Sequence, residues 1–130
     1  MDTFQKNYEA IEALVGEDLK TWVSRAGRVI KRKSSGFMDL TIETLGNGCI
    51  SLTHYYEQTG DLVPDPDMKI QIHPETQIAR ALHFQNSLGY WEVYPEEGKV
   101  HPFQLKAQNE FLTMWLRNLK AQGFYPKKGG

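Results

Sequence analysis

The sequence contains one cysteine, Cys49, and no long run of apolar residues. A single cysteine cannot form an internal disulfide and cannot supply a CxxC metal-binding knuckle. No segment approaches the ~18 consecutive apolar residues that a membrane-spanning helix needs. The acidic, amphipathic N-terminus does not resemble a signal peptide. We therefore expect a protein without a membrane segment, and the lone cysteine suits a reducing cytoplasm.

The chain also lacks an excess of one charge and lacks the common catalytic motifs. Its 15 Lys+Arg against 16 Asp+Glu give a net charge of -1, so the total charge implies no strongly charged partner. No Gly-rich phosphate loop, GxSxG elbow, HExxH or paired-carboxylate signature occurs. From the sequence we assign no catalytic residue, no metal site and no cofactor.

The sequence does contain a change of hydrophobic period, from three or four residues to two and back again. Apolar residues recur every three or four positions from about Asp2 to about Arg25, which predicts a helix. The apolar stripe stays in phase across Gly16, which favours one kinked helix. A second stripe of this kind predicts a helix from about Pro102 to about Gln122, with Pro102 in the first turn.

The region between these helices alternates apolar and polar residues, as half-buried strands do. Its strand-like runs are 38–43, 49–57, 68–73, 78–85 and 90–94, with a further short candidate at 28–32. A sheet with one apolar face needs a cover, so both helices are expected to pack on that face. We predict one α+β domain over residues 1–125, with an antiparallel sheet of about five strands. Residues 126–130 are expected to form a flexible tail.

The segment "HYYEQTGDLVPDPDMKI" joins two of these strands. Pro64 and Pro66 remove two backbone donors, which predicts a rigid connector on the solvent side and not a central strand. His54 is expected at the rim of the core. The alternative is a catalytic or ligand site formed by His54, Tyr56 and Asp61. The three nearby acids, Asp61, Asp65 and Asp67, do not match a calcium loop.

The segment "RAGRVIKRK" is the most basic part of the chain. Its cations could contact a nucleic-acid backbone, but a solvated linker and a lysine-protected edge strand are favoured. The residues concerned are Arg25, Arg28, Lys31, Arg32 and Lys33.

Four aromatic residues, Tyr55, Tyr90, Trp91 and Tyr94, are candidates for binding another protein. Tyr55 is expected on the face that the helices do not cover. Tyr90 and Tyr94 share one face of their strand, and Trp91 lies on the other. If Tyr55 meets Tyr90 or Trp91 there, an exposed aromatic patch results. The alternative is that a loop or the first helix covers them.

Three motifs carry a resemblance to known families, over the part of the chain from Cys49 onward. The helix "LKAQNEFLTMWLRNLKAQGF" resembles the closing helix of the YqiB-like bacterial proteins. The motifs "HYYEQ", "GDLVPDPDM" and "WLRNLKAQGF" are similar to those of a small uncharacterised bacterial family often met on plasmids and integrative elements. Thr53 stands where that family has glycine before the first motif. The resemblance implies a bacterial cytoplasmic protein of mobile-element origin, and it assigns no activity.

These observations lead to three hypotheses. The first is a non-enzymatic interaction or regulatory domain that binds a protein through the open sheet face or an edge strand. The second is weak nucleic-acid binding through the basic segment. The third is an uncharacterised enzyme or ligand site near His54 and Asp61.

Overall fold

The chain folds as helices, then strands, then a helix. A computed structural model describes residues 2–127, and all of their side chains except those of 57, 58, 62 and 64. The elements are α1 (Thr3–Val15), α2 (Leu19–Trp22), β1 (Val29–Arg32), β2 (Leu40–Gly46), β3 (Cys49–Gln58), β4 (Asp61–His73), β5 (Ile78–Asn86), β6 (Gly89–Glu92) and α3 (Pro102–Ala121). The α+β class is confirmed. Of the predicted tail, residues 128–130 lie outside the described residues.

The strands form one antiparallel sheet in which their order follows the sequence, from β1 to β6. Each strand turns back on the one before it through a short connection. Between β2 and β3 the turn places Asn47 and Gly48 at φ of 54° and 75°, the left-handed backbone that a two-residue hairpin requires. Over the described residues the sheet has six strands and not about five, because the short candidate at the N-terminal end pairs as β1.

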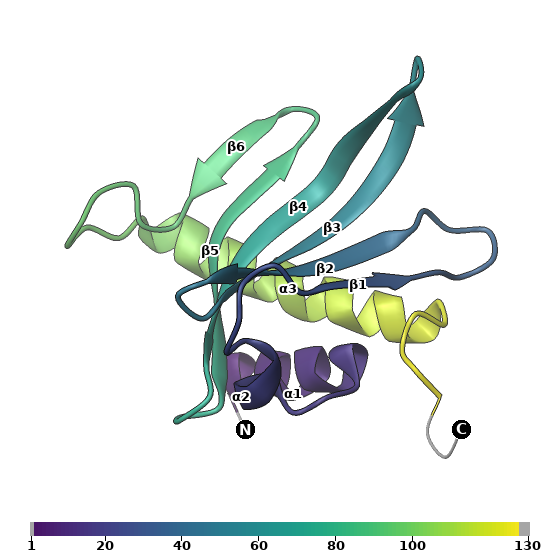
Figure 1. The fold of residues 1–130 in the computed structure, drawn as a ribbon. Helices are drawn as coiled ribbons and strands as arrows, with labels where there is room; N and C mark the ends of the chain where they lie inside the picture. Colours follow the sequence, from purple (N-terminus) through teal and green to yellow (C-terminus); the bar gives the residue numbers. More distant parts are fainter. Residues whose placement is uncertain (1, 128–130) are drawn as a thin grey trace.

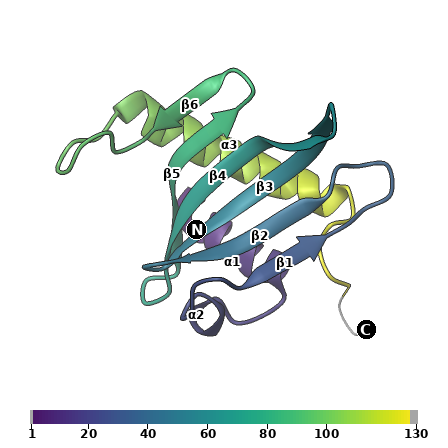
Figure 2. The ribbon, with the colours of Figure 1, turned by 45° about the horizontal axis from the view of Figure 1, so that its top comes forward.

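Both α1 and α3 lie on the same side of the sheet (Figures 1 and 2). The sheet residues that face them are fully buried, as the period of two predicted. These residues include Leu40, Ile42, Ile50, Leu52, Met68, Ile70, Ala79 and Ala81, and they meet Leu112, Trp115, Leu116 and Leu119 of α3. The first helix lies below the lower ends of the strands in Figure 1, whereas α3 crosses behind the sheet.

The first helix is not one kinked helix to Arg25, as the in-phase stripe predicted, but two. Gly16 ends α1 in the left-handed conformation, with φ of 80°. The Asp18 carboxylate then accepts a hydrogen bond from the Thr21 backbone N–H and caps α2. Leu19 and Trp22 remain buried after the break, so the apolar stripe alone could not reveal it.

The proline-rich segment is also not a connector, because β4 runs through it from Asp61 to His73. Its first part pairs only with β3, since β5 begins to pair with β4 at Asp67. Pro66 lies at the register shift opposite Thr53 and Tyr55, after a cis peptide bond. Prolines are tolerated at such an edge and at such an irregularity, because no ladder there needs their missing donors. In Figure 1 this β3–β4 hairpin projects beyond the other strands.

A small buried polar network fixes α3 on the sheet. The register shift between β4 and β5 lies beside Ala81, whose backbone N–H donates to Oδ1 of Asn109 at 3.0 Å. The Asn109 side chain donates to the Leu105 carbonyl at 2.7 Å, which holds the amide in this orientation. Asn7 of α1 donates to the Asn109 carbonyl at 3.3 Å and accepts from Thr113 at 2.8 Å. The Asn109 side chain thus joins the sheet to α3, and the Asn109 backbone carbonyl joins α3 to α1.

Asn109→Ala should lower the free energy of unfolding by about 1–3 kcal/mol, because it leaves a buried N–H without an acceptor. Urea unfolding measures this change. The control is Asn118→Ala, the same substitution at an exposed position of α3, which should have little effect. Equal losses in the two variants would contradict the role of the buried amide.

Candidate functional site

The four candidate aromatic residues lie on two different sides of the sheet. Trp91 pairs with Phe84 across β5 and β6, and the two rings lie 6.1 Å apart on the side of α3. Tyr90 lies on the open side, with its ring 4.9 Å from that of His83 and its hydroxyl donating to Glu92 at 2.7 Å. Neighbouring strand residues face opposite ways, as the alternation requires.

Neither Tyr55 nor Tyr94 enlarges the Tyr90 or the Trp91 position into an aromatic patch. Tyr55 lies on β3, three strands from β6, which is about 14 Å at the usual strand spacing. Tyr94 follows β6 and accepts a hydrogen bond from Arg80 at 2.9 Å. The structure therefore does not bring Tyr55, Tyr90, Trp91 and Tyr94 together.

The open face of the sheet is mainly polar. Its side chains engage one another: Thr53 donates to Asp67 at 2.7 Å, and Arg80 donates to His73 at 2.9 Å. Burial lowers the pKa of His83, and burial followed by the charge of Arg80 lowers that of His73. One row across this face reads Glu43, Ser51, Lys69, His83 and Glu92. This row holds both acids and a lysine, so it carries no field of one sign.

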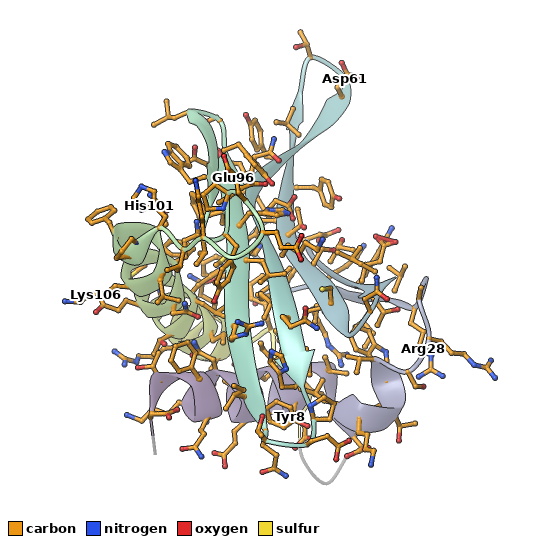
Figure 3. All side chains as sticks on the ribbon, turned by 90° about the vertical axis from the view of Figure 1, so that its left-hand side faces the viewer. Tyr8, Arg28, Asp61, Glu96, His101 and Lys106 are labelled. Carbon is orange, nitrogen blue, oxygen red and sulfur yellow. The ribbon has the colours of Figure 1, made fainter. Side chains whose placement is uncertain are left out.

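The residues of the predicted ligand site lie apart. His54 is buried, whereas Asp61 is exposed at the tip of the β3–β4 hairpin (Figure 3). Asp61 pairs with Gln58, four residues along β3 from His54, which corresponds to about 13 Å. Tyr56 is half-buried between them.

Two of the five basic residues cap helices. Arg28 donates to the carbonyls of Thr21 and Trp22, at 2.8 and 3.1 Å, at the end of α2. Cations at this position satisfy free carbonyls and oppose the helix dipole.

Arg32 does the same at the end of α1, donating to Leu14 and Val15 at 3.2 and 2.8 Å. Lys33 forms an exposed ion pair with Asp39 at 3.6 Å, and Arg25 and Lys31 are exposed. The basic segment is thus divided between helix caps and solvent.

Arg32→Ala should lower the free energy of unfolding by about 1–3 kcal/mol, because it frees two carbonyls at the end of α1. Lys33→Ala is the matched control, since it removes a neighbouring cation that forms only an exposed ion pair. Chemical denaturation of both variants gives the comparison. A loss as large in the Lys33 variant would show that net charge, and not the cap, stabilises this region.

Apolar side chains are exposed along α3. Phe103, Ala107, Phe111 and Met114 follow one another at spacings of four, four and three, which places them along one side of the helix. Phe103 is 70% exposed and Met114 is 47% exposed. Across from them lie Trp91 of β6 and the loop before β2.

Two pockets lie between α3 and the elements opposite it, and both are lined by Phe111. One, of about 300 Å³, is lined by Phe84, Asn86, Trp91, Gln104, Ala107, Gln108 and Phe111. The other, of about 310 Å³, is lined by Phe37, Met38, His54, Pro66, Phe111, Met114, Trp115, Asn118 and Gln122. Among the side chains that the structure describes, no Asp, Glu, Lys or Arg lines either pocket. We call the two pockets together the α3 groove.

A continuous chain of rings runs from one end of the α3 groove to the other, through its floor and the core beneath. Neighbouring ring centroids lie between 5.0 and 6.1 Å apart, within the range of favourable aromatic contacts. The order along the chain is Trp91, Phe84, Phe111, Trp115, His54, Phe124 and Phe37. The two exposed ends of the groove are therefore joined through the core of the protein.

His54 belongs to this floor as a neutral ring. Its Nδ1–H donates to the Asp39 carbonyl at 3.2 Å, and its ring lies 5.6 Å from Trp115 and 5.5 Å from Phe124. Burial lowers the pKa of His54 below its ordinary value, against the smaller opposing effect of the backbone carbonyls of Asp39 and Met38. The histidine is thus a packed residue at the rim of the core.

The lowered pKa of His54 predicts a loss of stability in mild acid. The unfolded chain binds the proton more tightly than the folded protein, so stability present above about pH 6.5 decreases as the pH falls below that value. Between pH 7.5 and pH 5.5, the free energy of unfolding should fall less in His54→Gln than in the wild type. Urea unfolding at both pH values measures the two slopes, and equal slopes would contradict the buried, neutral state.

Sequence reasoning missed the α3 groove because it assigned its residues elsewhere. Met38 was expected inside a strand, but β2 begins at Leu40 and leaves Met38 44% exposed beside Phe37. The available signal was the width of the apolar stripe on the last helix. That stripe is broader than one contact with a sheet requires.

Among residues 2–127, no three or more His, Cys, Asp or Glu side chains gather closely enough to hold a metal ion. Within that same range, no helix has the length and hydropathy needed to cross a membrane.

The fold and the groove define an α+β protein with a one-sided antiparallel sheet and an uncharged, aromatic-floored surface along its last helix. The chain belongs to the DUF6908 family, a domain of unknown function, whose family model matches residues 6–125. The match includes α1 from Lys6 onward, which the resemblance noted from the motifs did not cover. Neither the curated proteins nor the solved structures contain a match to this chain.

Proposed function

We propose that this protein is a non-enzymatic interaction domain that binds another protein in the α3 groove. The observation that supports this proposal is the groove itself, with its uncharged lining and its exposed apolar rim. At the rim Phe37 is 47% exposed and Trp91 is 38% exposed. Exposed apolar surface of this kind marks interaction sites, and the centres of protein interfaces are depleted of charge.

The groove supports binding better than the open sheet face does. On the open face, charged side chains such as Lys69 and Glu92 would lose water on contact with a partner. In the groove, burial of Met114 and Trp91 would cost little desolvation and would remove apolar area from water. The hypothesis that this protein binds another protein is therefore retained. The proposed binding surface, however, is the α3 groove and not the open face on the other side of the sheet.

The proposal includes a bacterial, cytoplasmic setting and an origin on a mobile element. The resemblance of "GDLVPDPDM" and "WLRNLKAQGF" to a bacterial family, and the more distant one to the YqiB-like proteins, support it. The buried thiol of Cys49, whose pKa is raised by burial, suits a reducing compartment.

Photo-crosslinking from both faces tests the proposed function. In cells that naturally produce the protein, p-benzoylphenylalanine replaces Met114 in one variant and Tyr90 in another, since the two positions are similarly exposed, at 47% and 49%. We expect one covalent adduct from the Met114 position that is absent from the Tyr90 position. It should also disappear when Ala107→Gln is added to fill the neighbouring pocket. Adducts from Tyr90 alone, or from neither position, would refute the proposal.

A further inference from the structure

We infer that the partner element in the α3 groove is an amphipathic helix with large apolar side chains at heptad spacing. This inference rests on the proposed function and adds the chemistry of the partner. Three features of the groove support it: the spacing of residues on α3, the small number of free polar groups in the lining, and the charged residues of α3 beside the groove.

The first feature is a second helical stripe on α3, separate from the one that faces the core. Its members follow one another at spacings of three, four, three, four and three, the pattern by which two helices interdigitate. They are Gln104, Ala107, Phe111, Met114, Asn118 and Ala121, and all are half-buried or exposed. A stripe with this period matches another helix lying along α3.

The two pockets follow the same spacing. The α3 residues of one pocket centre near position 107 and those of the other near position 116. At 1.5 Å per residue this separation is about 13 Å. Apolar residues seven or eight apart on a partner helix lie on one face and are separated by about 10–12 Å. Long side chains would cover the remaining distance.

The second feature is the state of the polar groups in the groove. Gln108 donates to the Trp91 carbonyl at 2.9 Å and to Gln104 at 3.0 Å, and Asn86 accepts from Leu88 at 2.8 Å. The Oε1 atom of Gln108 is buried and has no hydrogen-bond partner among the described residues. An extended peptide would bring one N–H and one carbonyl per residue into a lining that has few free partners for them. A helix forms these hydrogen bonds internally, so it avoids this cost.

The third feature is the charge on the solvent side of the stripe. Glu110 and Arg117 lie seven residues apart there, both exposed, and neither forms an ion pair with another described residue. Charges that flank a heptad stripe pair with opposite charges on the partner. The partner helix should therefore carry a base beside Glu110 and an acid beside Arg117.

Two methionines at the edge of the α3 groove suit an amphipathic helix as the partner. Met38 and Met114 lie on opposite banks of one pocket, 44% and 47% exposed. Their unbranched side chains adapt to different apolar shapes, as in other surfaces that accept helices.

Selection from a displayed library of random 18-residue peptides tests the inference. The wild-type protein serves for selection, and the double variant Ala107→Gln/Met114→Asp serves for counter-selection. We expect enriched peptides with large apolar residues seven or eight apart. As synthetic peptides they should gain helical circular dichroism on binding.

Variants of α3 then locate the binding. Ala107→Gln or Met114→Asp should weaken an enriched peptide at least tenfold. Lys120→Ala, on the same helix but on the side that borders α1, should leave binding unchanged. Glu110→Lys should weaken a peptide that carries the complementary base, and exchanging that base for an acid should restore binding. A proline in the middle of the peptide should abolish it.

The outcomes separate this inference from the proposed function. Groove-dependent peptides with alternating apolar residues and no gain in helicity would overturn the helix and leave the interaction domain intact. Peptides that bind the double variant equally well would refute both. A wild-type dimer in sedimentation that dissociates in Met114→Asp would assign the groove to a second copy of this chain and overturn the inference.

Discussion

The hydrogen bond from the Ala81 backbone to Asn109 is the constraint on which the rest of the structure depends. A register shift in a sheet disturbs the local pairing, and here the shift lies on the side that the helices cover. The asparagine amide satisfies the N–H there and fixes the position of α3 along β5. Because Asn7 binds the backbone of the same residue, the position of α1 follows from that of α3. A sheet and two helices are thus aligned through one buried residue, Asn109.

The shape of the groove follows from the lengths of these elements. α1 ends at Gly16 and covers only the lower ends of the strands in Figure 1. The β3–β4 and β5–β6 hairpins extend past it, and of the helices only α3 borders their apolar side. Phe84 and Trp91 therefore pack against α3 on one flank and remain partly in solvent on the other. The groove is the part of the helix-facing surface that a short first helix leaves uncovered.

The sequence alone was sufficient to predict features that depend on the local period of apolar residues. Alternation placed Ile50 and Leu52 inward and assigned Tyr90 and Trp91 to opposite sides, because strand geometry alone decides this. It failed where the answer depends on a distant partner. Pro64 and Pro66 are compatible with β4 only because β5 is too short to pair there, and no local pattern shows the length of a neighbouring strand.

The same limit applies to the candidate sites. Arg28 and Arg32 read as part of a basic run, but each reaches back to the end of a helix that lies earlier in the chain. His54 and Asp61 are seven residues apart in sequence, yet a hairpin places one in the core and the other in solvent. The α3 groove combines residues from the loop before β2, from the strands β3 to β6, and from α3 with the residue after it, Gln122. Its members share no motif, so only the tertiary structure could assemble them.

The continuous chain of aromatic rings couples the α3 groove to the stability of the fold. Phe111 and Trp115 line the groove and also pack in the core. The row of ring contacts continues from Trp115 to His54 and then to Phe124, near the end of the chain. A side chain bound against Phe111 would therefore contact residues that also hold α3 on the sheet. Any partner that binds the folded protein and not the unfolded chain stabilises it by mass action. Met114 and Ala107, in contrast, border the groove without being fully buried, so substitutions there can alter recognition while the core stays intact. The proposed recognition and the fold therefore share Phe111 and Trp115, whereas Met114 and Ala107 belong to the groove without being part of the core.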